Sequence, residues 1–333
     1  MNRASEAGES NLRIVSELDA MARHHFSWIN KSFVHVLILQ EWGVREISTR
    51  IGEEYEREIP RCFRIVERIL ELGGCPSLEA GRKAYVRHLP TAGRTVAKML
   101  ERERAMIEGF NDALDRSEEL LAGIGEDEGS AIAKEARSSR AKYLDWLCRA
   151  GDSISTENRE RAMCSVTDAS NAQWLALNRL FAHLQPAIEE TCVHMLLLRH
   201  TGHSEASDQA WRDSYAYMLY AADIVRLFAR CNWALELANP EVSGDVREPA
   251  IAESVEGALE SERNRLADLA EVANVTAEML SGRASPDLEA IPRDVLGYTR
   301  ARIEGQADDP PKPARSIEKM LDGYAYRFSV GSG

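Results

Sequence analysis

The residues of this chain best able to do chemistry are its cysteines, histidines and closely spaced carboxylates, and few of them match the spacing of a known site. The six cysteines share no short paired spacing: Cys62, Cys75, Cys148, Cys164, Cys192 and Cys231. Without a CxxC pair they are interpreted as free thiols, not as a zinc site or a disulfide framework. The sequence has no Walker loop, no GxGxxG segment and no recognisable Ser–His–Asp motif. Chemistry therefore has to come from side chains that the fold brings together.

The amino-acid composition limits the classes of partner that this chain can bind. The chain has 333 residues, with 54 Asp and Glu against 41 Lys and Arg, a net charge of −13. That charge opposes binding to nucleic acid phosphates or to an anionic membrane surface. The longest apolar run, Phe33–Leu39, includes His35 and is far shorter than the roughly 20 residues of a membrane span. The N-terminus has no apolar segment of a secretion signal, so we expect a cytoplasmic protein that binds neither nucleic acid nor membrane.

Apolar residues recur at spacings of three and four along most of the chain, which predicts helices throughout. The expected helices of the first half cover about 16–41, 45–72, 92–122 and 128–150. A kink is expected at Pro60, and glycines end the helices at Gly43 and Gly73. Long helices with one long connection, from about 76 to 91, are typical of a four-helix bundle with a crossover. The predicted fold class is all-α.

The second half of the sequence repeats the first at one constant offset, called the repeat offset below. Val34-His35 matches Val193-His194, and Ile65-Val66 matches Ile224-Val225. Beyond the long connection the same offset, 159, still matches Glu103-Arg104 with Glu262-Arg263. One offset that holds on both sides of a connection indicates a tandem duplication. The predicted organisation is a bundle at 12–150, a linker at 151–165, a second bundle at 166–305 and a tail at 306–333.

The first half resembles a bacterioferritin, of the ferritin-like superfamily, over about residues 20–150. The residues that carry the resemblance are packing and turn positions: Ile29-Asn30, Phe33, His35, Trp42-Gly43, Glu67-Arg68-Ile69-Leu70, Gly74, Pro76 and Asp145-Trp146-Leu147. The second half resembles that family only through the first. The resemblance implies two irons held inside the bundle by four carboxylates and two histidines.

Most positions that the resemblance assigns to iron ligands hold other residues. They are His25 on the first helix, Glu58 and Arg61 on the second, Arg140 and Tyr143 on the fourth, and Glu103 or Glu108 on the third. The haem-ligating methionine of the family falls on Ile59. In the second half the positions are Leu184, Tyr217, Tyr220, Thr299 and Arg302, and only Glu262 stays acidic. Arginine cannot ligate a metal and stays charged. We therefore expect no ordinary ferroxidase site, with Arg61 and Arg140 paired to Glu58 and a third-helix glutamate.

Two interpretations of the remaining polar residues stay open. His25 and Glu58, with Glu103 or Glu108, form either a remodelled three-ligand metal site or polar core groups paired to arginine. His24 and His35 are about 16 Å apart on one helix face and cannot share a metal. The repeat offset matches them with His183 and His194. This repetition suggests that the histidines make a structural hydrogen bond in each bundle or lie at the seam between the bundles. An aromatic stripe in the second half, either core or ligand pocket, contains Trp211, Tyr215, Tyr217 and Tyr220.

Two functions follow from these alternatives. The first is a ferritin-like pseudoenzyme that works in binding, scaffolding or assembly, with no expected cofactor. Its two halves pack together, it forms no 24-subunit cage, and its partners are a second copy, another protein or a small molecule. The second is a divergent metal-dependent oxidase or oxygenase that uses iron or another divalent metal in the first bundle. A third hypothesis, apart from these two, is a subunit that supports an active homologue.

Overall fold

The protein is built from long helices. The computed structural model describes residues 3–77, 94–151, 154, 158, 161–163, 171–235, 246, 251–282 and 284–305. Within them lie α1 (Arg3–Glu41), α2 (Arg45–Glu71), α4 (Val96–Gly123), α5 (Asp127–Ala150), α7 (Asn171–His200), α8 (Ser204–Cys231), α10 (Val255–Leu280) and α11 (Pro286–Ile303). An isolated bridge joins Thr95 and Ala162, which both lie in this part of the chain. The all-α prediction is confirmed.

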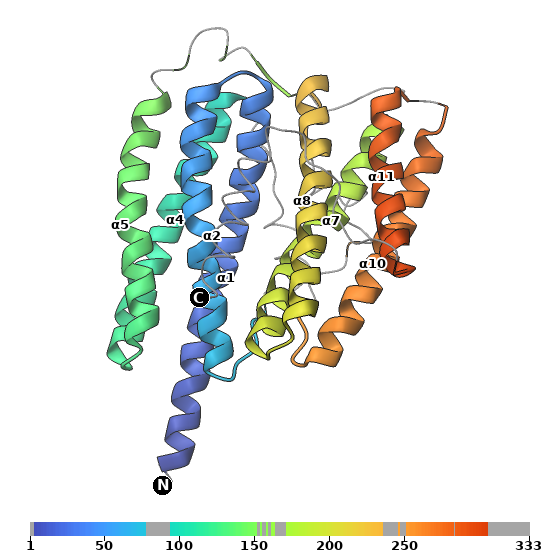
Figure 1. Ribbon diagram of the computed structural model, residues 1–333. Helices are drawn as coiled ribbons and strands as arrows, with labels where there is room; N and C mark the ends of the chain where they lie inside the picture. The colour runs from blue at the N-terminus through green and yellow to red at the C-terminus, as the bar shows by residue number, and fades with distance from the viewer. Residues whose placement is uncertain are drawn as a thin grey trace.

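The helices form two four-helix bundles side by side (Figure 1). In the first bundle α1 packs on α2 and α4, and α5 packs on α4 and α2. In the second, α7, α8, α10 and α11 repeat this arrangement. The bundles meet where α1 packs on α8 and α2 packs on α7, which places the outer pairs α4–α5 and α10–α11 far from the seam. Exchanging the two bundles therefore turns one of these helix pairs into the other.

The repeat offset also relates the local structure of the two bundles. It carries the starts of α2, α4 and α5 onto the starts of α8, α10 and α11. Thr95 caps α4 by accepting from the Lys98 backbone N–H at 3.2 Å, and Ser254 caps α10 by accepting from that of Gly257 at 3.1 Å. Equivalent positions thus start equivalent helices with the same kind of hydrogen bond.

The helix ends expected from the sequence differ from the observed ends in two places. The first helix begins at Arg3 instead of about residue 16, and the third begins at Val96 instead of about 92. The second helix runs as one element through Pro60. Of the predicted linker, Met163 donates a backbone hydrogen bond to Arg94 at 2.7 Å, and Arg161 donates to the Trp42 carbonyl at 2.7 Å. The predicted tail lies outside the described residues.

Buried apolar side chains from both bundles form one continuous cluster. At the seam, the Trp42 indole N–H at the end of α1 donates to the Ala229 carbonyl of α8 at 3.1 Å. The apolar core therefore continues across the seam between the two bundles. Among the described helices, none is long and apolar enough to cross a membrane.

Candidate functional site

A single buried carboxylate, Glu58 of α2, organises the interior of the first bundle. His25 of α1 places its Nδ1 2.8 Å from one carboxylate oxygen, and Arg140 of α5 donates to the same oxygen at 2.7 Å. Arg61, one turn along α2, donates to the other oxygen at 2.6 Å. Glu58 and His25 have no exposed surface. Three helices thus direct polar side chains at one carboxylate, which predicts a charge-assisted network of strong hydrogen bonds.

Arg140 is held in place by aromatic rings as well as by Glu58. Its guanidinium carbon lies 3.4 Å from the centre of the Phe110 ring of α4 and 5.4 Å from that of Trp28. Only 1% of Arg140 is exposed. Stacking on ring faces and a fixed ion pair both suit the planar guanidinium. The cationic group therefore fills the middle of the bundle between α1, α2, α4 and α5.

Burial and neighbouring charges set the protonation of this network. Burial lowers the pKa of His25 from 6.5 to about 4, despite the opposing effect of Glu58. Burial alone would raise the pKa of Glu58, but the charge of Arg140 and the hydrogen bond from His25 bring it below its usual value. At neutral pH the histidine is uncharged and donates its Nδ1–H to the carboxylate. The charged pair is therefore Glu58 with the arginines.

The second partner of Arg61 differs from the one expected. Its Nε donates to Glu135 of α5 at 3.1 Å, and Arg64 donates to the same carboxylate at 2.9 Å. The expectation of a third-helix glutamate is wrong because α2 packs on α5, whereas α4 packs on α1 and α5. Arg61 thus connects the buried Glu58 to a carboxylate on the surface groove between α2 and α5.

Glu103 of α4 belongs to a different group of side chains from Glu58. Its carboxylate accepts from the Ser32 hydroxyl at 3.0 Å and lies 2.6 Å from the Nδ1 of His35. The second bundle repeats this group at the positions given by the repeat offset: Thr191, His194 and Glu262, at 3.0 and 2.8 Å. The structural hydrogen bond expected for His35 and for its counterpart His194 is confirmed. His24 stacks on Phe110, with ring centres 5.2 Å apart.

Of the four residues proposed for a remodelled metal site, the structure brings together His25 and Glu58. Glu103 is occupied by His35 and Ser32. Glu108 is exposed on α4, 3.6 Å from Arg104. Within the described ranges, no group of three or more His, Cys, Asp or Glu side chains is placed to hold a metal ion.

In the second bundle the carboxylate that organises the interior is Asp213 of α8. The repeat offset matches Asp213 with Glu54 of the first bundle. Arg302 of α11 donates two hydrogen bonds to its carboxylate at 2.6 and 2.8 Å, and the Tyr298 hydroxyl donates a third at 2.6 Å. The remaining positions implied by the resemblance are buried in the core or bonded to backbone: Leu184, Tyr217, Tyr220 and Thr299. This bundle therefore also holds an arginine–carboxylate pair, but at a different place.

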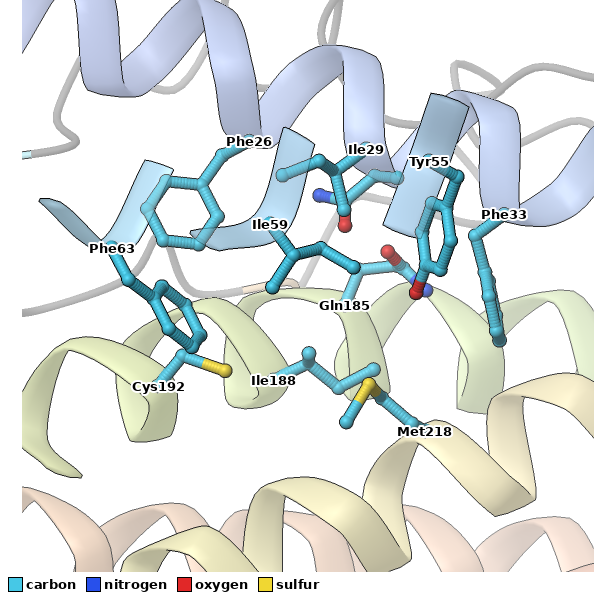
Figure 2. Close-up of a pocket in the computed structure, with 11 residues that line it drawn as sticks. Phe26, Ile29, Phe33, Tyr55, Ile59, Phe63, Gln185, Ile188, Cys192 and Met218 are labelled. Atoms are coloured by element: carbon cyan, nitrogen blue, oxygen red, sulfur yellow. The ribbon is translucent and has the colours of Figure 1, made fainter. Parts of the chain in front are cut away.

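A small cavity lies at the seam between the bundles (Figure 2). The first bundle contributes mainly aromatic rings, and the second contributes Gln185, Ile188, Cys192 and Met218. The cavity volume of 30 Å³ has room for about two water molecules. Ile59, the position of the family's haem ligand, and Met218, its counterpart at the repeat offset, both line it. A porphyrin does not fit a space of this size, so the cavity as folded does not match the haem site that the resemblance implies.

Sequence reasoning missed several residues that the structure makes important. Phe110, Glu135 and Asp213 contact arginines of the two bundles, yet each lies dozens of residues away from its partner in the sequence. Met218 carried an available signal, because the repeat offset places it opposite Ile59.

The fold and its interior define a class of protein made of two joined four-helix bundles, each with a buried carboxylate that is paired to an arginine. No family model matches the chain. Over 131 residues the chain is 24% identical to the bacterial ferritin of Synechocystis sp. (strain ATCC 27184 / PCC 6803 / Kazusa). That match covers 39% of this chain and 72% of the cyanobacterial protein. Together with the helical bundles, this similarity supports a ferritin-like relationship.

Proposed function

We propose that this chain is a ferritin-like protein, formed by tandem duplication, that acts in binding or assembly and not as a ferroxidase. The observation that carries the proposal is the contact between Arg140 and Glu58 in the centre of the first bundle. Glu58 is the carboxylate that the resemblance assigns to the second helix. Its oxygens accept hydrogen bonds from two guanidinium groups and one imidazole.

A metal ion at this place would have to displace a guanidinium that cannot leave easily. Arg140 is fully enclosed between Phe110 and Trp28, and it remains a cation because an arginine side chain does not lose its proton in proteins. A positive charge fixed beside Glu58 repels a second cation in a medium of low polarity. We therefore assign the cluster a structural role.

Duplication accounts for the shared helix starts and for the seam. Ferritin-like bundles that pair as separate subunits must use one identical surface on both sides of a two-fold axis. Within one chain the two surfaces are free to differ, as they do around the seam cavity. The proposed domain limits, 12–150 and 166–305, follow from this interpretation.

Metal analysis of the full chain tests the proposal. The protein is purified without chelator and its metal content is measured by ICP-MS, before and after anaerobic Fe(II) loading and desalting. The cyanobacterial ferritin, treated in parallel, is the positive control. We expect far less than one iron per chain and no change on Glu58→Ala. Stoichiometric iron that Glu58→Ala removes would overturn the proposal and support the alternative, a metal-dependent oxidase.

A further inference from the structure

A basic groove runs along the surface of the first bundle between α2 and α5. It has a volume of 780 Å³, within the range of small-molecule sites. Its charged lining consists of five cations and two carboxylates: Arg50, Arg57, Arg61, Lys134, Lys142, Glu54 and Glu135. This excess of positive charge stands out on a chain whose net charge is −13.

Helical spacing explains why the cations gather. Arg50, Arg57 and Arg61 lie seven and four residues apart, so they share one face of α2. Lys134 and Lys142 lie eight residues apart on the facing side of α5, with Ser138 between them. Two neighbouring helices thus present their basic faces to the same groove.

The carboxylates of the groove leave its cations only partly neutralised. Glu54 is buried and is shared by Arg50 and Arg57, at 2.8 and 2.6 Å. Glu135 is shared by Arg61 and Arg64. Arg50 has a further partner in the exposed Glu53, at 2.8 Å. Because most of these carboxylates serve two guanidinium groups, several N–H donors remain for an incoming anion.

The two lysines are the most available cations of the groove. Both are exposed, and in the described part of the chain neither forms an ion pair or a hydrogen bond. The floor between the helices is formed by Arg61, which is 8% exposed and bonded to Glu58 below. The groove therefore offers exposed ammonium groups beside a guanidinium that is held by Glu58.

The second bundle shows that the fold does not require this basic set. At the repeat offset, the counterparts of Arg50, Arg57 and Arg61 are Gln209, Ala216 and Tyr220. The counterparts of Lys134 and Lys142 are Arg293 and Ala301. Five cations in one bundle thus correspond to one in the other, although the helices start in the same register. The basic set is therefore a feature of the first bundle and not of the pattern that the two bundles share.

We propose that the groove between α2 and α5 binds a soluble anion that carries several phosphate groups. Arginine forks match phosphate oxygens in pairs, and lysines add charge. Phosphate groups place many negative charges on few atoms, which suits five cations in one groove. A flat membrane surface would not reach Arg61, which is 8% exposed between the two helices. The net negative charge of the chain also repels an anionic membrane. The proposal does not depend on the absence of a metal site.

The test uses the full chain and sodium tripolyphosphate as the probe, measured by isothermal titration calorimetry at low ionic strength. The test variant is Lys134→Gln/Lys142→Gln. The matched control, Lys98→Gln/Arg293→Gln, makes the same change in charge at exposed positions outside the groove, 61% and 57% exposed. Thermal unfolding followed by circular dichroism confirms that both variants fold.

We expect wild-type protein and the control to bind equally, and the groove variant to bind about tenfold more weakly. Added salt should weaken binding by the wild type. Absence of binding, or equal weakening by both variants, would overturn the proposal. So would citrate binding as tightly as tripolyphosphate, since the ligand would then be a carboxylate. Binding to phosphatidic acid vesicles without binding to tripolyphosphate would exclude a soluble ligand.

Discussion

Asn30 of α1 donates a buried side-chain hydrogen bond to Glu189 of α7, and the two residues are separated by 159 positions. Because this separation equals the repeat offset, two copies of one position meet each other. In a symmetric dimer only a residue on the two-fold axis contacts its own counterpart. The pair therefore marks a pseudo-two-fold axis between the bundles. Because one member is asparagine and the other is glutamate, the symmetry is not exact in sequence.

Exchanging these two residues tests the pseudo-symmetry. Asn30→Glu sets two carboxylates against each other at a buried position, and we expect the free energy of unfolding to fall by about 3 kcal/mol or more. Adding Glu189→Asn recreates the same pair in the opposite direction and should restore most of this loss. Denaturant unfolding of the full chain measures both. A double variant no more stable than Asn30→Glu would contradict a two-fold relation at this point.

Removing the central carboxylate of the first bundle tests how strongly its ion pairs hold the core. Glu58→Ala leaves Arg140 buried and without its counter-charge, which is expected to cost about 3–5 kcal/mol in unfolding free energy. Glu135→Ala, on a side chain that is 50% exposed, should cost less than about 1 kcal/mol. Glu58→Leu/Arg140→Met should be more stable than Glu58→Ala, because no unpaired charge remains. Similar losses in all three would argue against a charge effect.

Acid should destabilise the protein through His25. Burial lowers its pKa to about 4 in the folded chain, from 6.5 in the unfolded chain. Between these two pH values the unfolded chain therefore binds more protons than the folded chain. Stability therefore falls as the pH drops from about 6.5 to about 4, by roughly 3 kcal/mol in all. The pKa of Glu58 is also lowered, which adds a loss at more acid pH.

His25→Gln separates this effect from general acid denaturation. The variant keeps an N–H donor for Glu58 but has no proton to gain, so its stability should change less between pH 6.5 and 4.5 than that of the wild type. The exposed His200→Gln is the matched control and should follow the wild type. Unfolding midpoints in urea at several pH values give the comparison. Identical profiles for the wild type and His25→Gln would refute the assignment.

The sequence predicts the helices well because each is long and strongly periodic, and the single offset transfers helix starts from one bundle to the other. It also predicts that Arg61 and Arg140 pair with Glu58, since inward positions on neighbouring helices must satisfy buried charge. It does not predict Glu135 as the second partner of Arg61, because the order of helices around a bundle is a property of packing. The basic face of α2 could have been predicted from the sequence, because the spacing of Arg50, Arg57 and Arg61 places all three on one side of a helix.

The seam cavity yields the last prediction. Gln185 is 1% exposed, and neither polar atom of its amide has a hydrogen-bond partner among the residues that the structure describes. A buried amide without partners opposes folding. Gln185→Leu should therefore raise the free energy of unfolding by about 1 kcal/mol, measured in denaturant. Gln185→Phe, which copies its counterpart Phe26, should lower it by about 1–3 kcal/mol, because the cavity cannot take a second ring at this place. A loss of stability in Gln185→Leu would mean that ordered water in the cavity satisfies the amide.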